Sequence, residues 1–215
     1  MAVICIAGAA EGIGKTAVAE LLLPHLRGWH VARVRIADEI PPAEAATLAE
    51  RGYRLVPPSA ARDPESERLA AAGSTGVTVL LAEPRGLEDG LRALLRDRRP
   101  DEHLLIEGNA YLWARPADAA IMVIGAGPSG KGLVRVRPSV REIFKQIGIW
   151  AWNTRSDLHA EGFFEFPQAL ARMGLKDAIS NRADFHDVHP PQADYAGNAA
   201  FIECVLDTIA RQRGK

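Results

Sequence analysis

The residues with the clearest chemical potential lie in a glycine-rich stretch near the start of the chain. This stretch runs from Gly8 to Thr16 and ends in Gly14-Lys15-Thr16. The apolar run 3–7 before it predicts a buried strand, and residues 17–23 after it predict a helix. A glycine turn between a strand and a helix suits phosphate, because its N–H groups can turn inward and the helix N-terminus adds partial positive charge.

The individual residues of this stretch have distinct expected roles. Lys15 is expected to reach the terminal phosphates of a nucleotide and to act in catalysis, and the Thr16 hydroxyl is expected to ligate Mg²⁺. The other nucleotide-binding residues predicted from the motif are Gly8, Ala10, Glu11, Gly12, Ile13, Gly14 and Ala17. The competing interpretation is a chance glycine turn that opens a helix, and the order of strand, turn and helix favours a nucleotide site.

The spacing of the loop departs from the usual pattern in one place. Four residues normally separate the first glycine from Gly-Lys-Thr, and Ala9 occupies that first position here. Gly8 lies one residue earlier. Either the turn tolerates alanine, or the loop is one residue longer than usual.

Two acidic residues that follow predicted strands are candidates for metal binding. Glu107 ends the apolar strand 104–108, where a carboxylate beside a phosphate loop would complete the Mg²⁺ shell, and Gly108 leaves room for a ligand. Asp38 follows the predicted strand 31–36. It is expected either to bind Mg²⁺ or orient an attacking water, or merely to cap the next helix, and the sequence leaves both open.

Two further segments offer candidate contacts for a substrate. Asn109 begins a segment predicted as a loop that would wall a small-molecule pocket. The stretch Gly125–Gly132 has the usual glycine spacing but carries glycine where Ser or Thr would hold Mg²⁺, and a strand-like pattern follows it. We therefore expect a basic flap rather than a second nucleotide loop, with Lys131 and Arg135 able to reach an anionic ligand.

Asn153 follows the run 147–152, which is predicted as the last strand, and is a candidate for hydrogen bonding to a purine edge. Guanine-selective proteins carry Asn-Lys-x-Asp at this point. This chain lacks the lysine and has Asp157 one place late, which leaves the base open with a preference for adenine.

The order of the predicted elements and the bulk composition define the expected class of protein. Strands and helices alternate after the first loop, which predicts an α/β, three-layer P-loop NTPase fold with a mainly parallel central sheet flanked by helices. The alternating basic residues of 31–36 predict a strand near a sheet edge, and 53–63 is predicted as a loop. No linker divides the chain, so a single nucleotide-binding domain over residues 1–215 is expected.

Charge and hydropathy limit the expected partners. A formal net charge of -1 gives no attraction to nucleic acid along the whole sequence, so no nucleic-acid partner is expected. No apolar run is long enough to span a bilayer and no signal segment is recognised, so we expect no membrane partner and a cytoplasmic location.

The chain resembles two families of P-loop proteins. The long loop Gly8-x₅-Gly14-Lys15-Thr16 and the pair Glu107-Gly108 are similar to features of dethiobiotin synthetase. A larger part, roughly the first 125 residues, resembles the molybdopterin-guanine dinucleotide biosynthesis protein B family. Both families differ from this chain after the second strand, where the dethiobiotin enzyme has lysine-proline and the molybdenum-cofactor family has lysine and histidine. The resemblance implies a protein that binds Mg²⁺ and ATP or GTP. In this class the active site is often built across a homodimer, so a homodimer is a possible partner arrangement that the resemblance implies.

Three functions follow as hypotheses. The leading one is hydrolysis of ATP or GTP, or transfer of the terminal phosphoryl group, with Asp38 orienting the attacking group. The second is a small-molecule kinase or ligase of the dethiobiotin synthetase type, with a small-molecule acceptor beside the flap. The third is a non-catalytic nucleotide-binding accessory protein for metallocofactor assembly.

Overall fold

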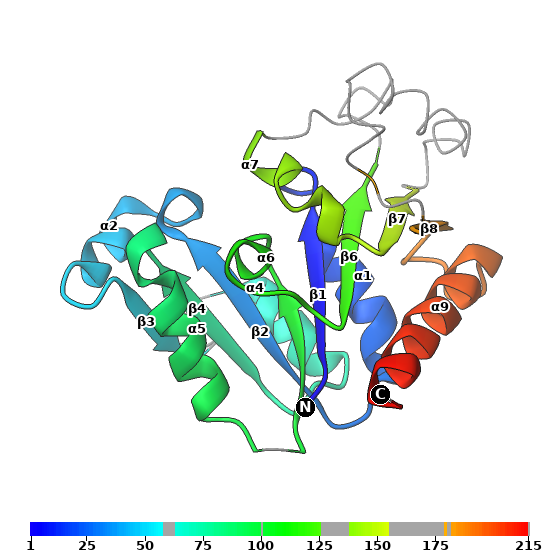
Figure 1. Ribbon diagram of the computed structural model, residues 1–215, viewed down its shortest axis with the longest axis horizontal. Helices are drawn as coiled ribbons and strands as arrows, with labels where there is room; N and C mark the ends of the chain where they lie inside the picture. Colours follow the sequence, from blue (N-terminus) through cyan, green and yellow to red (C-terminus); the bar gives the residue numbers. More distant parts are fainter. Residues whose placement is uncertain (58–62, 100, 126–137, 155–178, 180–181, 215) are drawn as a thin grey trace.

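The computed structural model describes residues 1–57, 63–99, 101–125, 138–154, 179 and 182–214. These residues form three layers, with a central sheet between two layers of helices (Figure 1). The predicted α/β three-layer fold with a mainly parallel sheet is confirmed.

The sheet has eight strands in the order β3-β4-β2-β5-β1-β6-β7-β8. Every pairing is parallel except that of β3 with β4, which is antiparallel. Since β1 lies between β5 and β6, the loop after β1 opens at the middle of the carboxyl edge, where parallel sheets bind ligands. The strands are β1 Val3–Gly8, β2 Trp29–Ile36, β3 Tyr53–Val56, β4 Val77–Ala82, β5 His103–Glu107, β6 Ala119–Ile124, β7 Ile149–Asn153 and β8 Asp184–Val188.

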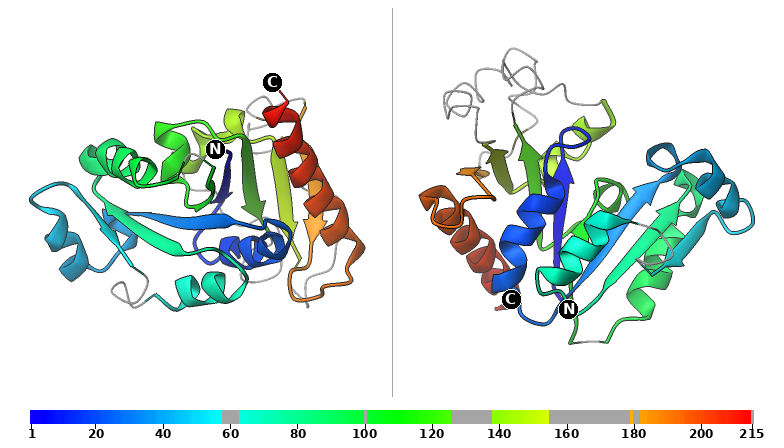
Figure 2. Two further views of the ribbon diagram at one scale, coloured as in Figure 1. Left: turned by 90° about the horizontal axis from the view of Figure 1, so that it is seen from below. Right: turned by 180° about the vertical axis from the view of Figure 1, so that it is seen from behind.

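The helices divide between the two faces of the sheet. Helices α5, α6 and α7 cover one face, and α1, α4 and α9 cover the other, as the view from behind in Figure 2 shows. The short α2 lies toward the β3 edge. The helices are α1 Lys15–Leu22, α2 Pro42–Ala45, α4 Pro64–Ala71, α5 Leu87–Arg96, α6 Ala110–Ala114, α7 Pro138–Arg141 and α9 Ala196–Arg213.

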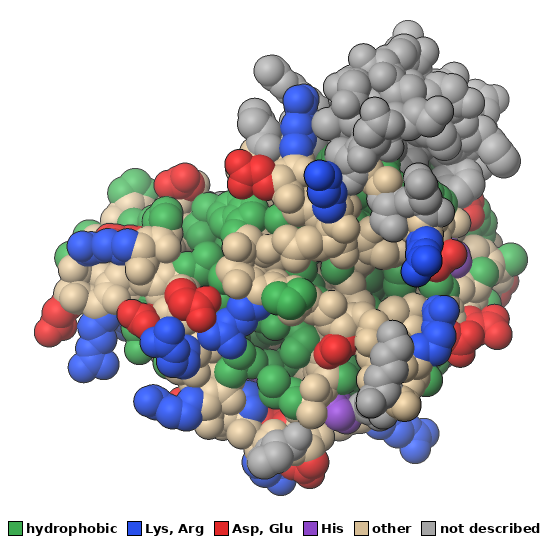
Figure 3. Space-filling view, viewed as in Figure 1, with side chains coloured by type: hydrophobic (Ala, Val, Ile, Leu, Met, Phe, Trp, Pro, Cys, Tyr) green, Lys and Arg blue, Asp and Glu red, His purple; other side chains and the backbone are tan. Residues whose placement is uncertain are grey.

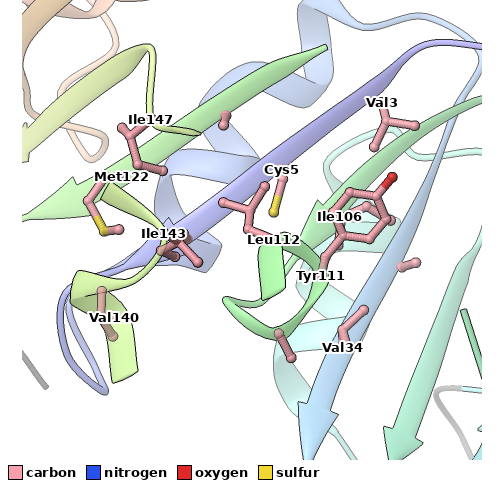
Figure 4. Packing of buried hydrophobic residues seen from close by; sticks show 14 of the residues in the cluster. Val3, Cys5, Val34, Ile106, Tyr111, Leu112, Met122, Val140, Ile143 and Ile147 are labelled. Carbon is pink, nitrogen blue, oxygen red and sulfur yellow. The ribbon is translucent and has the colours of Figure 1, made fainter. Parts of the chain in front are cut away.

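The alternation of side chains along β1 builds both layers of the core. Cys5 points to the face that carries Tyr111 and Leu112 of α6 (Figure 4). Ile4 and Ile6 point to the opposite face, where α1 and α9 pack. A strand that is buried on both faces reads as a continuous apolar run, which is why its sequence predicted it correctly. Burial raises the pKa of the Cys5 thiol well above its ordinary value.

Several sequence predictions about the order of the strands and about loops are wrong. The strand predicted near an edge from 31–36 is β2, and it lies inside the sheet between β4 and β5. The stretch 53–63, predicted as a loop, begins with the edge strand β3. The strand predicted from 147–152, β7, is not the last, because β8 pairs with it on its outer side. The segment after Asn109, predicted as a loop, contains α6.

The described helices and the face shown in Figure 3 bear on the expected absence of membrane and nucleic-acid partners. In the part of the chain that the structure describes, no helix combines the length and the apolar character that crossing a membrane requires. Acidic and basic side chains are interspersed on the face that Figure 3 shows, in keeping with the small net charge.

Candidate functional site

The turn between β1 and α1 contains two glycines in the left-handed backbone conformation. Gly12 and Gly14 have φ angles of 64° and 98°, values that glycine adopts without the steric cost other residues carry. Gly14 is the residue before α1, so the loop ends at the helix N-terminus. This arrangement provides a site for an anion, because N–H groups and the positive end of a helix dipole lie together.

The unusual spacing of the loop has a simple structural explanation. The Ala9 amide donates to the Val123 carbonyl at 2.9 Å, so Ala9 still pairs with β6. Four residues then separate Ala9 from Gly14, as in the usual motif. Alanine therefore stands at the position of the first glycine, and its side chain is fully buried. This pairing fits a turn that tolerates alanine, the first of the two alternatives.

Lys15 lies over the start of its own loop. A Cβ placed on Gly8 would approach the Lys15 Cδ to 3.0 Å, so the aliphatic part of the lysine passes across the Gly8 backbone. Gly8 has an ordinary φ angle, and the close packing of Lys15 and Ile13 explains why a side chain is disfavoured there.

Glu107 and Thr16 face each other at the base of the loop. The Thr16 Oγ1 donates to the Glu107 Oε1 at 3.1 Å, and the exposed fraction of each residue is no more than 5 %. They meet because β5, which ends at Glu107, is the direct neighbour of β1. A hydroxyl and a carboxylate side by side are hard oxygen donors of the type that Mg²⁺ prefers.

A buried arginine that the sequence prediction missed also binds Glu107. The Arg33 Nε donates to the Glu107 Oε2 at 3.0 Å, and Arg33 Nη2 lies 3.4 Å from Oε1. The other side of the guanidinium contacts the carboxylates of Asp63 and Glu65, which lie at the start of α4. Three carboxylates therefore surround one guanidinium at the carboxyl end of β2 and β5.

Electrostatics in this cluster favour the ionised forms of Arg33 and Asp63. Burial acts to lower the pKa of Arg33, but the carboxylates of Glu107, Asp63 and Glu65 more than compensate and raise it above its ordinary value. Burial acts to raise the pKa of Asp63, yet the Ser66 hydroxyl, which donates to it at 2.7 Å, and the Arg33 guanidinium hold that pKa below its usual range. The cluster carries more negative than positive charge.

A cavity of about 720 Å³ unites the loop and the charged cluster. Of the predicted site residues, ten line it: Gly8, Ala10, Glu11, Gly12, Gly14, Lys15, Thr16, Ala17, Glu107 and Asn109. The wall opposite the loop comes from residues of β2, α2 and α4 and the segments next to them, namely Arg33, Val34, Arg35, Pro41, Glu44, Asp63, Pro64, Glu65 and Arg68. A second hollow, of about 460 Å³, lies between β3 and α5 and contains none of the predicted site residues.

The remaining predicted residues lie elsewhere. Asp38 is exposed in a short 3-10 turn and is not among the described residues that line the cavity. Ile13 and Asn153 lie beneath the loop, where the Asn153 Nδ2 donates to the Ile13 carbonyl at 2.9 Å. Lys131 and Arg135 lie outside the described residues.

The donor set suits a metal that arrives with a nucleotide better than a metal held by protein alone. Within the described residues, no group of three or more His, Cys, Asp or Glu side chains is arranged to hold a metal ion. Mg²⁺ characteristically takes one or two protein oxygens and completes its shell with phosphates and water. Thr16 and Glu107 fit that pattern.

Comparison with known proteins gives a limited result. No protein-family model matches the sequence, and no curated protein does. Among solved structures, the chain is similar to the MinC:MinD cell division protein complex of Aquifex aeolicus, with 15% identity, a TM-score of 0.42, and coverage of 100% of this chain and 97% of that one.

Two other solved structures are similar at the same level. The signal recognition particle receptor FtsY of Elizabethkingia anophelis has 13% identity and a TM-score of 0.41 over 94% of this chain and 64% of that one. A shikimate kinase of Acinetobacter baumannii, in complex with shikimate, has 13% identity and a TM-score of 0.31, with coverage of 100% of this chain and 96% of that one. The order of the chain's own strands, its loop and its first helix give a P-loop nucleotide-binding fold.

Proposed function

We propose that this chain is a Mg²⁺-dependent nucleotide-binding protein that hydrolyses ATP or GTP or transfers the terminal phosphoryl group. The observation that carries the proposal is the contact of 3.1 Å between the Thr16 hydroxyl and Glu107, at the base of a loop with a phosphate-binding backbone. A structural helix start needs no buried carboxylate beside it. A site that receives phosphate and a cation needs both the glycine loop and the carboxylate beside it.

In this proposal each residue has a role that follows from its place. The loop amides and Lys15 bind the phosphates, and Lys15 stabilises the charge that develops on the transferred group. Thr16 and Glu107 hold Mg²⁺, which would neutralise phosphate charge when bound. Glu107 enters the site already oriented, because Thr16 and Arg33 bind its two oxygens.

The attacking group requires a residue that faces the phosphates. Asp38 was predicted for this role, and its turn would have to move toward the cavity to fulfil it. That role stays a prediction. Glu11, Glu44 and Asp63 already line the cavity, and they are alternative groups to orient a water or a hydroxyl.

The test is calorimetric titration with non-hydrolysable ATP and GTP analogues, in Mg²⁺ and in chelator, together with turnover assays. We expect binding that Mg²⁺ strengthens, and loss of turnover in Lys15→Ala with the fold retained. Lys145→Ala, a change of the same type at an exposed lysine away from the cavity, serves as the control. Absence of any nucleotide binding by folded protein overturns the proposal.

A second candidate, a small-molecule kinase or ligase, draws support from the wall of the cavity opposite the loop. That wall contains the charged side chains of Arg35, Glu44 and Arg68. An enzyme that transfers the phosphoryl group only to water does not need these polar groups in its cavity. A panel of acceptors that stimulates nucleotide turnover would favour this candidate. Binding without turnover would favour the accessory role that the resemblance to molybdopterin-guanine dinucleotide biosynthesis protein B suggests.

A further inference from the structure

Two asparagines bind the backbone of the phosphate loop from different strands. Asn109 follows β5 and makes two hydrogen bonds to Gly8: its Oδ1 accepts from the Gly8 amide at 2.7 Å, and its Nδ2 donates to the Gly8 carbonyl at 3.0 Å. Asn153 ends β7, and its Nδ2 donates to the Ile13 carbonyl at 2.9 Å. The loop is therefore held at its first residue and again just before Gly14.

Asn109 extends the ladder between β1 and β5 with its side chain. The Gly108 amide donates to the Ile6 carbonyl at 3.1 Å, which is the last backbone bond of this pairing. The amide group of Asn109 then supplies one donor and one acceptor to Gly8, as the next residue of a strand would. Asn and Gln side chains carry this pair of groups on one planar amide that does not ionise.

Asn153 packs directly beneath the last loop residue. A Cβ placed on Gly14 would lie 2.1 Å from the Asn153 Nδ2, so the asparagine and the glycine backbone are in close contact. Asn153 is 9 % exposed and is not among the described residues that line the cavity. Its Nδ2 donates to the loop backbone.

We infer that Asn109 and Asn153 are positioning residues, which hold the phosphate loop in its binding shape before a polyphosphate arrives. This inference rests on the proposed nucleotide function and changes the role expected for Asn153 from base recognition to loop support. Both groups are neutral, so they satisfy backbone groups without cancelling the attraction of the loop for an anion. A loop that is ordered in advance spares the binding step the entropy of ordering it.

The test uses three ligands that share a polyphosphate but differ in the base: ATP, GTP and inorganic tripolyphosphate. Each is titrated by calorimetry, in Mg²⁺, into the wild-type protein and into the Asn153→Ala and Asn109→Ala variants. We expect each variant to bind all three ligands about five- to tenfold more weakly, by a similar factor, since each loses a loop contact of about 1 kcal/mol.

Asn198 provides a matched control. It is 1 % exposed, is not among the described residues that line the cavity, and makes the same kind of contact: its Oδ1 accepts from the His189 amide at 2.8 Å, and its Nδ2 donates to the His189 carbonyl at 3.0 Å. Asn198→Ala should lower thermal stability about as much as Asn109→Ala and Asn153→Ala do, while its affinity for tripolyphosphate stays at the wild-type value. An equal loss of tripolyphosphate affinity in all three variants would indicate a general loss of structure and would overturn the inference.

The remaining possible results of these titrations also support or contradict the inference. A loss confined to ATP or GTP in Asn153→Ala, with tripolyphosphate binding unchanged, makes Asn153 a base-reading residue and overturns the inference for it. Unchanged affinities in both variants overturn it altogether. If a variant does not fold, hydrogen exchange in the wild-type protein replaces it: slow exchange of the Gly8 amide, which donates to the Asn109 Oδ1, before ligand is added supports the inference, and fast exchange contradicts it. Failure of the wild-type protein to bind any of the ligands instead refutes the proposed function.

Discussion

The two halves of the cavity are held together by different kinds of interaction. The phosphate-loop half is fixed by neutral amides, those of Asn109 and Asn153, that bind loop backbone. The opposite half is fixed by buried charges, with Arg33 between Glu107 and Asp63. Neutral supports leave the loop dipoles available for an anion, whereas the charged half keeps a surplus of carboxylate that suits a cation.

The position of Lys15 sharpens this contrast. Among the ion pairs of the described residues, none involves Lys15, while Arg33 takes part in three. A lysine that is not neutralised by a neighbouring carboxylate can give its full charge to a phosphate. The arginine instead acts as an internal counter-ion, and its main consequence is the orientation of Glu107.

The largest expected effect comes from removal of the buried cation. Arg33→Gln leaves Asp63 and Glu107 buried without their partner, so we expect the free energy of unfolding to fall by about 3–5 kcal/mol. Chemical denaturation at neutral pH measures the change. Arg68→Gln is the control, because Arg68 is 55 % exposed in its pair with Glu20 and its loss should cost less than about 1 kcal/mol.

Equal losses in these two arginine variants would contradict the comparison, since the charged half would then owe its stability to something other than burial. Arg33→Gln combined with Asp63→Asn provides a further check. The double variant removes one charge of each sign, and we expect it to recover part of the stability that the single change loses.

The sequence predicted the local elements of the site better than the contacts between them, because those contacts join residues that lie far apart in the chain. The loop, its helix and the acid at the end of β5 are local patterns of strand, turn and terminal residue, and all three lie where they were expected. The partners of Arg33 lie 30 and 74 residues away in the chain. The pattern of apolar and polar residues within one strand or helix does not identify such distant partners.

The same reason explains the misplaced strand. An arginine in an alternating strand is typical of a solvent-exposed edge, and this interpretation of 31–36 was wrong because Asp63 and Glu107 neutralise Arg33 inside the sheet. A partial signal was present in the acidic start of the helix at 64–71, which contains Glu65. The target of Asn153 was likewise hidden, since Ile13 lies 140 residues earlier.

A second prediction separates two glycines of the loop. Gly14→Ala places a Cβ 2.1 Å from the Asn153 Nδ2 at a φ of 98°, so we expect a loss of roughly 2–3 kcal/mol in stability together with loss of tripolyphosphate binding. Gly12→Ala meets no atom within 4 Å, and only its φ of 64° opposes it, at about 1 kcal/mol. Thermal unfolding and calorimetry measure both variants. If the two behave alike, the contact between Asn153 and Gly14 has no part in holding the loop.

The smallest effect concerns acid stability and belongs to the charged half alone. The folded-state pKa of Asp63 is below its ordinary value of 3.8, so the unfolded chain binds the proton more readily and stability falls as pH drops below about 4. One group contributes a slope of at most about 1.4 kcal/mol per pH unit. Denaturation at pH 5, 4 and 3 should show a shallower decline for Asp63→Asn than for the wild type.

His30, at the opposite end of β2 from the cavity, allows this acid effect to be assigned. Burial, followed by the charge of Arg98, lowers the pKa of His30 to about 4 from its ordinary 6.5, so its contribution to stability is lost between those two values. Below pH 4 the histidine is protonated in both folded and unfolded chains and contributes no further slope. His30→Gln should therefore flatten the decline above pH 4 and leave the decline below it. A decline below pH 4 that is identical in wild type and Asp63→Asn would mean that Asp63 does not depend on its charge to hold Arg33, and the division of the cavity into a neutral and a charged half would lose its electrostatic basis.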